Sequence, residues 1–230
     1  MLPIAILAGG LASRLGSITH SIPKSLIMFE GRPFIDWQLS LLSAGGYTDI
    51  VLCLSHLGKQ IQRFVGNGDK WGVTVRYSFD GERQMGTGGS ILNAIPLLGK
   101  EFAVIYGDSY LPIDFKEIED SFLSGKKKSL MTVYRNSDNL DKSNVEFTDG
   151  ALKRYVKSGE GGMFHIDYGL NYLTLSAFDS FAKGTSFDLS KVLFKLAREG
   201  ELQGYEVYRR FYEVGSVSGI YDFQKFVEKR

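Results

Sequence analysis

The chain has few of the residues that stabilise folds through disulfide bonds or bound metal ions. It contains one cysteine and three histidines among 230 residues, so no disulfide framework is available. The histidines, at positions 20, 56 and 165, lack the spacing of metal ligands. The single thiol, Cys53, lies inside the apolar run at 50–54, which predicts a buried structural residue and argues against a nucleophile.

Long apolar runs and an excess of charge are also missing. Nowhere do 18 apolar residues follow one another, and the N-terminus has no basic region followed by a long apolar stretch, so we expect a cytoplasmic protein with no membrane partner. Net charge is +1 from 27 basic and 26 acidic side chains, which predicts no nucleic-acid partner. An anionic ligand must therefore be bound by local geometry. Whether the chain forms a homo-oligomer is left open.

What the chain does have is enough apolar sequence for one domain, 43% of 230 residues, with alternating strand and helix patterns in its first half. Such βαβ alternation predicts an α/β fold: a doubly wound, mostly parallel, Rossmann-like sheet with helices on both faces. The expected strands are 4–8, 50–54, 73–79 and 102–106, and the expected helices are 33–44, 57–64 and 89–98, the last broken at Pro96.

After residue 110 the segments become shorter and predict a small antiparallel lobe. We therefore expect one domain over 1–230, with the parallel sheet in a first half at 1–110 and the lobe in a second half at 111–230. The expected helices here are 115–123, 176–182, 189–198 and one from about 218, and the expected strands are 129–134, 145–147, 152–156, 168–175, 202–209 and 211–214.

The most informative pattern follows the first strand. Gly9-Gly10 presents bare backbone N–H groups at the carboxyl end of the strand, and Arg14 and Lys24 add positive charge nearby. The spacing fits neither a Walker A loop nor the Rossmann G-x-G-x-x-G motif. This pattern predicts a different phosphate-handling loop in a nucleoside triphosphate site.

Two later motifs suit the same ligand. Gln84-Met85-Gly86-Thr87-Gly88-Gly89-Ser90 lies between a strand and a helix, where three glycines allow backbone to approach a planar base. Asp108 is the second residue after the fourth strand, beside Gly107, and is placed to hold Mg²⁺ against phosphate oxygens.

Together these segments resemble the sugar-1-phosphate nucleotidyltransferases, also called nucleotide-sugar pyrophosphorylases. The resemblance spans essentially the whole chain and includes Phe211 to Ser216, where Glu213 occupies the position of a second metal-binding acid. It implies that Arg14 and Lys24 are catalytic and that Asp108 and Glu213 bind Mg²⁺. The nucleotide-binding residues it implies are Leu7, Ala8, Gly9, Gly10, Gln84, Gly86, Thr87 and Gly88.

The resemblance also implies one nucleotidyltransferase domain over 1–230, with a nucleotide-binding half at 1–110 and a sugar-phosphate-binding half at 111–230 that contains the antiparallel, sugar-binding lobe. It implies the second substrate as well. Lys157 aligns with a lysine that binds the sugar phosphate, and Asp167 and Gly169 fall in a segment similar to the strand that lines the sugar pocket. The expected reaction is attack of a sugar 1-phosphate on the α-phosphorus of a nucleoside triphosphate, which releases pyrophosphate. The compact chain and its G-T-G-G loop most resemble heptose 1-phosphate guanylyltransferases, so GTP with a heptose or mannose 1-phosphate is the expected pair.

Three alternatives remain. Gln84 carries a donor and an acceptor, so it could read a pyrimidine as in thymidylyl- and uridylyltransferases. A cytidylyltransferase of the same fold could act on another phosphorylated substrate. A non-catalytic nucleotide-binding module would need the same glycine loops, although Arg14, Lys24, Asp108 and Glu213 argue against it.

Overall fold

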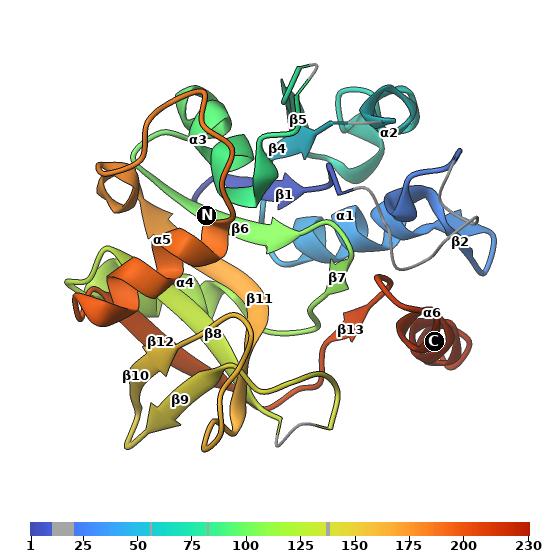
Figure 1. The fold of residues 1–230 in the computed structure, drawn as a ribbon. Helices are drawn as coiled ribbons and strands as arrows, with labels where there is room; N and C mark the ends of the chain where they lie inside the picture. The colour runs from blue at the N-terminus through green and yellow to red at the C-terminus, as the bar shows by residue number, and fades with distance from the viewer. Residues whose placement is uncertain (11–20, 56, 82, 137–138) are drawn as a thin grey trace.

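A parallel sheet forms the centre of the computed structural model, which describes residues 1–10, 21–55, 57–81, 83–136 and 139–230 (Figure 1). Its strands β1 (Ile4–Leu7), β4 (Asp49–Leu54), β5 (Thr74–Phe79) and β6 (Glu101–Tyr106) lie in the order β6-β1-β4-β5. The chain proceeds from β1 to β4 and β5 on one side and returns to β6 on the other. A crevice outside the carboxyl ends of the strands is expected at such a reversal point, between β1 and β6.

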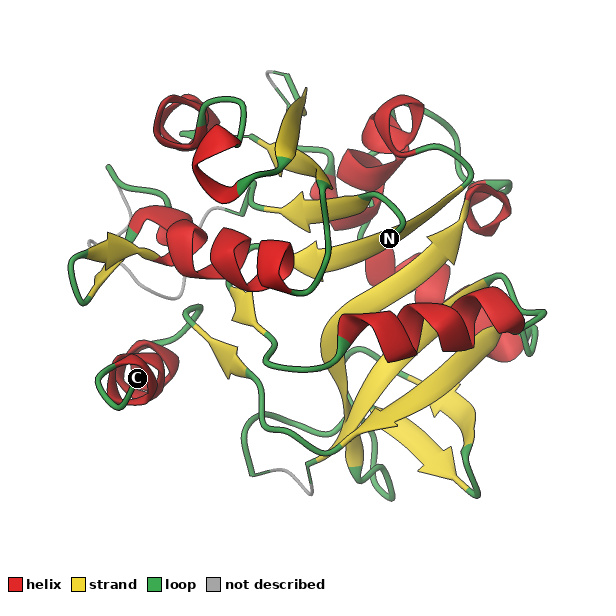
Figure 2. Cartoon of the chain, turned by 180° about the vertical axis from the view of Figure 1, so that it is seen from behind, coloured by secondary structure: helices red, strands yellow, loops and turns green. Residues whose placement is uncertain are grey.

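Helices cover both faces of this sheet (Figures 1 and 2). Alternate residues of β1 point to opposite faces: Ile4 and Ile6 pack in one apolar cluster, and Ala5 packs in another. The first cluster includes residues of α1 (Phe34–Ala44), α2 (Gly58–Val65) and α4 (Phe115–Ser124); the second includes residues of α3 (Gly86–Leu98) and α5 (Leu189–Arg198). The predicted doubly wound α/β fold is confirmed.

Two helix predictions are wrong. The helix expected at 89–98 begins earlier, at Gly86, and runs through Pro96 without a break. Pro96 is two residues from the end of α3, so only the last turn has to accommodate the missing N–H. The helix expected at 176–182 is a short 3-10 turn, η4 (Leu175–Phe178).

The antiparallel strands of the second half extend the central sheet and do not form a separate lobe. The long strand β11 (His165–Thr174) pairs antiparallel with β6 and with β8 (Ser129–Arg135), and the hairpin of β9 (Val145–Thr148) and β10 (Ala151–Tyr155) continues the same nine-stranded sheet. β12 (Leu202–Val207) lies parallel to β8. The register of β11 against β8 shifts between Asp167 and Asn171.

Short segments complete the fold around the end of the sheet. A ribbon of β2 (Met28–Phe29) and β3 (Arg32–Pro33) and a ribbon of β7 (Ser109–Tyr110) and β13 (Tyr212–Glu213) are covered by α6 (Val217–Val227). Phe223 of α6 packs edge-on against Phe29 and Phe34. Two 3-10 turns are η2 (Lys24–Leu26) and η3 (Asp69–Trp71). Within the described ranges, no helix combines the length and apolar character needed to cross a bilayer.

Candidate active site

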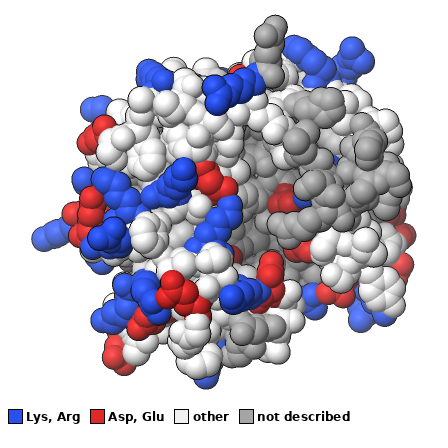
Figure 3. Space-filling view, in the orientation of Figure 1, with Lys and Arg blue, Asp and Glu red and all other residues white. Residues whose placement is uncertain are grey.

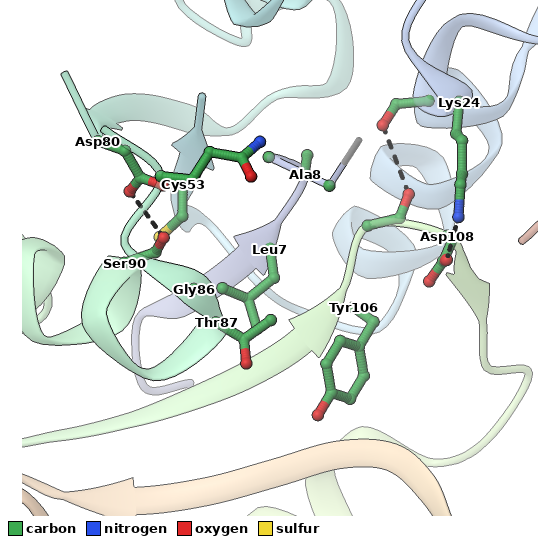
Figure 4. A pocket seen from close by; sticks show the side chains of 15 residues that line it. Leu7, Ala8, Lys24, Cys53, Asp80, Gly86, Thr87, Ser90, Tyr106 and Asp108 are labelled. Atoms are coloured by element: carbon green, nitrogen blue, oxygen red, sulfur yellow. Dashed lines mark hydrogen bonds and ion pairs between the residues drawn. The ribbon is translucent and has the colours of Figure 1, made fainter. Parts of the chain in front are cut away.

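A cavity of about 240 Å³ opens at the predicted reversal point, at the carboxyl ends of β1 and β6 (Figure 4). Its walls come from the end of β1, the turn η2, the start of α3 and the loop after β6. It brings together nine residues predicted from the sequence: Leu7, Ala8, Gly9, Gly10, Lys24, Gln84, Gly86, Thr87 and Asp108. Arg14, also predicted, lies outside the described residues.

One end of the cavity carries charge. Lys24 begins the turn η2, and its Nζ lies 3.2 Å from Asp108 Oδ2. The Lys24 side chain is 18% exposed and that of Asp108 is 33% exposed, so the pair is partly shielded but open to a ligand. Figure 4 shows this ion pair at the opposite end of the cavity from Asp80 and Ser90.

Glu213 reaches the same place through the β7–β13 ribbon. Ser109 pairs with Glu213, and the Val214 N–H donates to the Asp108 carbonyl at 2.9 Å. A Cβ atom added at Gly215 would lie 2.6 Å from Glu213 Oε2, 2.9 Å from Asp108 Oδ2 and 3.3 Å from Lys24 Nζ. The three charged groups therefore surround one point, which a side chain at residue 215 would fill.

The start of α6 holds the Glu213 carboxylate in that orientation. Ser216, the N-cap of α6, donates its hydroxyl to Glu213 Oε1, and the Gly215 N–H donates to Oε2. Proteins usually bind Mg²⁺ through one or two carboxylates together with phosphate oxygens of the substrate. Among the described residues no group of three or more His, Cys, Asp or Glu side chains is placed to hold an ion, so any ion here would rest on two carboxylates and ligand oxygens.

The other end of the cavity contains a carboxylate that the sequence analysis missed. Asp80 follows β5, and its Oδ1 accepts from the Ser90 hydroxyl at 2.6 Å while Oδ2 accepts from the Met85 N–H at 3.2 Å. Its position directly after an expected strand was the available signal. Cys53 also lines this end, and burial raises its pKa to about 12, which agrees with the expected inert thiol.

The glycine motif contacts protein as well as the cavity. The Gly88 and Gly89 N–H groups donate to the Phe187 carbonyl at 2.9 and 3.2 Å, and a Cβ at Gly88 would overlap the Phe187 ring. Thr87 Oγ1 accepts from the Leu189 N–H at 2.8 Å. Gly88 does not line the cavity. These glycines therefore allow the segment that precedes α5 to pack closely against the start of α3. Two N–H groups near the start of α3 are bonded to the Phe187 carbonyl and are not available to a ligand.

Lys157 lies apart from the cavity. It follows β10, forms an ion pair with Asp188, the N-cap of α5, and lines a separate open groove with Ser190 and Lys191. Lys157 does not line the cavity that contains Lys24.

Asp167 and Gly169 lie closer to the cavity, at the register shift of β11. A Cβ at Gly169 would lie 3.6 Å from the ring of Tyr106, which lines the cavity. Burial raises the pKa of Asp167 to about 6, although its carboxylate accepts hydrogen bonds from the Gly169 N–H and the Asn171 side chain. This carboxylate is therefore poorly solvated and close to the cavity wall.

The described part of the surface drawn in Figure 3 carries charges of both signs. On the face drawn in Figure 3, the described Lys and Arg side chains are interspersed with Asp and Glu. This distribution agrees with the net charge of +1, and the attraction for an anionic ligand must come from inside the cavity.

Comparison with known proteins identifies the family. The model of the nucleotidyl transferase family matches residues 4–144. The chain is 30% identical over 223 residues to N-acetylmuramate alpha-1-phosphate uridylyltransferase of Neisseria meningitidis, covering 95% of each. It is 28% identical over 193 residues to D-glycero-alpha-D-manno-heptose 1-phosphate guanylyltransferase of Campylobacter jejuni, covering 82% of this chain and 83% of that protein.

Solved structures agree with the fold. The crystal structure of HddC from Yersinia pseudotuberculosis superposes with a TM-score of 0.84 at 24% identity, over 99% of this chain and 100% of that one. The chain belongs to the nucleotidyl transferase family. The resemblance to the sugar-1-phosphate nucleotidyltransferases, expected from the motifs, is confirmed, and the protein is an enzyme of that family.

Proposed function

We propose that the enzyme transfers a nucleoside monophosphate from a nucleoside triphosphate to a sugar 1-phosphate and releases pyrophosphate. The observation that supports this most strongly is the convergence of Lys24, Asp108 and Glu213 around Gly215, at the charged end of the cavity. The two relatives described above are both named for sugar 1-phosphates. No protein nucleophile is needed, because the attacking phosphate is already an anion at neutral pH.

The main obstacle to this reaction is bringing several negative groups into line. Lys24 is held by Asp108 at the cavity wall, so it can stabilise charge on the α-phosphate without reorganising. The backbone of Gly9 and Gly10 lines the same wall. Arg14 is proposed to hold the leaving pyrophosphate.

Asp108 and Glu213 would hold the Mg²⁺ ion, because both carboxylates reach the same point. When bound, such an ion neutralises phosphate charge. The Glu213 carboxylate is held by the Ser216 hydroxyl and the Asp108 carboxylate by Lys24, so both acids have protein partners that orient them.

The polar end of the cavity suits a base, and we propose guanine as the preferred one. Asp80 offers a carboxylate acceptor and Gln84 an amide in the same cavity. Guanine presents two adjacent donors beside its O6 acceptor, so a carboxylate can accept from both donors while an amide donates to O6. Uracil presents one donor between two acceptors, which would place a carbonyl against the Asp80 carboxylate. Unpaired buried polar groups of this kind cost about 1–3 kcal/mol each.

UTP is the second candidate, since the relative matched over 95% of both chains is named as a uridylyltransferase. For the sugar, Asp167 and Gly169 are proposed to contact hydroxyl groups beside Tyr106, and a heptose or mannose 1-phosphate is the proposed acceptor. Lys157 would have to leave Asp188 to reach a sugar phosphate.

The test is a pyrophosphate-release screen that crosses GTP, UTP, dTTP, CTP and ATP with the 1-phosphates of heptose, mannose, glucose and N-acetylmuramate. Release that requires both substrates supports the proposed reaction, and release with none of the pairs contradicts it. A tenfold or greater preference for UTP, dTTP or CTP over GTP would overturn only the guanine assignment. The variant Arg14→Ala should lose about 10²-fold or more in turnover if its assigned role is correct.

A further inference from the structure

A buried amide in α1 binds both ends of the turn that carries Asp108. Gln38 is 0% exposed, and its Nε2 donates to the Tyr106 carbonyl at 2.9 Å and to the Ser109 carbonyl at 2.7 Å. These two carbonyls flank Gly107 and Asp108. One side chain thus spans the dipeptide between β6 and β7.

Gly107 and Asp108 form a turn between two strands, so other parts of the chain have to supply the hydrogen bonds that fix its backbone. β6 ends at Tyr106 and β7 begins at Ser109. The Gly107 N–H also donates to the Leu7 carbonyl at 3.0 Å, and the Asp108 carbonyl accepts from the Val214 N–H at 2.9 Å. Gln38 supplies the hydrogen bonds from α1, so the turn is fixed by β1, by the residue after β13 and by α1.

Packing alone does not explain an amide at this position. Gln38 Oε1 has no hydrogen-bond partner among the described residues, and a buried polar atom without a partner disfavours the folded state. An apolar side chain of similar length would avoid this cost but would leave the two carbonyls without their donor. Departures of this kind from good packing are expected where a sequence supports a functional site.

We propose that Gln38 is a positioning residue that fixes Asp108 against Lys24 and Glu213 and thereby sets the affinity of the site for a divalent cation. The proposal rests on the proposed function, which assigns Asp108 and Glu213 to the cation. Gln38 itself does not line the cavity and acts only through the backbone of the Asp108 turn. Mutation of residues that orient metal ligands in this way commonly lowers metal affinity by about 10- to 100-fold.

The test measures Mn²⁺ binding directly, by electron paramagnetic resonance of the full chain titrated with Mn²⁺ alone. Gln38→Met keeps the length of the side chain and removes the donor; Gln38→Asn keeps the amide but shortens its reach. We expect about a tenfold or greater rise in the Mn²⁺ dissociation constant for Gln38→Met and a rise for Gln38→Asn. Asn136→Leu is the matched control: Asn136 is 1% exposed and its amide donates to Ser143 Oγ at 3.1 Å in a loop that does not line the cavity.

The control separates positioning from general destabilisation. If Gln38→Met and Asn136→Leu lower the melting temperature alike but only the former weakens Mn²⁺ binding, the proposal stands. Unchanged Mn²⁺ affinity in a folded Gln38 variant overturns it, and if Gln38→Met does not fold, Gln38→Asn decides. A wild-type chain that fails to bind Mn²⁺ would instead contradict the cation site of the proposed function, so the two failures are distinguishable.

Discussion

Replacing Asp167 with asparagine should stabilise the protein at neutral pH while it weakens substrate binding. Burial raises the pKa of Asp167 from its ordinary value of 3.8 to about 6. The folded chain therefore holds this proton up to about pH 6, whereas the unfolded chain releases it near pH 4. The stabilising contribution of the protonated form is fully present below the unfolded pKa and is lost as pH rises through about 6.

The size of the effect follows from the two pKa values. A difference between 3.8 and about 6 corresponds to about 3 kcal/mol of free energy of unfolding at pH 8. Solvent reaches part of this residue, which reduces the figure to about 2 kcal/mol. For a chain of 230 residues, that is a rise of roughly 4–8 °C in melting temperature. Asparagine keeps the acceptor oxygen used by Gly169 and Asn171.

The assay is thermal melting of wild type and Asp167→Asn from pH 4 to pH 8. A matched variant, Asp188→Asn, is expected to change the melting temperature in the opposite direction. Burial also acts on Asp188, but its ion pair with Lys157 and the Ser190 hydrogen bonds hold the pKa of Asp188 below its ordinary value. Asp188→Asn keeps an N-cap residue and loses only the charge, so it should melt lower than wild type at pH 8. The gain of Asp167→Asn should shrink toward pH 4.

One outcome would refute this reasoning. If Asp167→Asn melts at or below the wild-type temperature at pH 8, burial does not penalise the Asp167 carboxylate. The proposed sugar contact has its own readout: the KM for the sugar 1-phosphate should rise in Asp167→Asn while the KM for the nucleotide changes little. Stability gained together with affinity lost would indicate that the carboxylate is retained for its ligand.

The remaining predictions concern the charged end of the cavity. Lys24→Ala should lower kcat by about 10²-fold or more with an unchanged circular dichroism spectrum, since a preorganised charge is lost; near-normal turnover would remove Lys24 from its role. Asp108→Asn should abolish the Mg²⁺ response and Glu213→Gln should weaken it, measured as initial rate against Mg²⁺ concentration; a double variant that responds as wild type does would place the ion elsewhere. Gly215→Ala should sharply lower Mg²⁺-dependent turnover, because its Cβ would lie 2.6 Å from Glu213 Oε2, whereas Gly161→Ala, with no atom within 4 Å of the added Cβ, should leave turnover unchanged.

Local sequence predicted the central sheet well, because β1, β4 and β6 each contain a continuous apolar run. The expected segments 50–54 and 102–106 overlap β4 and β6 almost completely. The pairing of the later strands was not accessible in the same way. β12 lies parallel to β8, and β11 carries a register shift at Asp167, and both depend on contacts between segments far apart in the chain. Hydrophobic periodicity reports which face a residue takes, not which strand it meets.

In the candidate site, too, residues in local motifs could be predicted and residues that depend on distant contacts could not. Lys24 and Asp108 were predicted from short motifs, and the structure places them in one ion pair. Gln38 gave no local signal, because a glutamine on an amphipathic helix is usually a surface residue. Its importance depends on the Tyr106 and Ser109 carbonyls, which lie about 70 residues further along the chain.

The glycine motif shows how one sequence pattern can serve two contacts. A glycine is required wherever a Cβ would collide, whether the approaching group is a nucleobase or another part of the protein. At Gly88 the approaching group is Phe187, whose carbonyl takes the N–H groups of Gly88 and Gly89. Because these donors are used internally, the positive charge proposed for the phosphates comes from Lys24 and Arg14, and Gly9 and Gly10 line the same cavity. In the proposed function the triphosphate therefore lies toward Lys24 and Asp108, and the base lies toward Asp80, at the opposite end of the cavity.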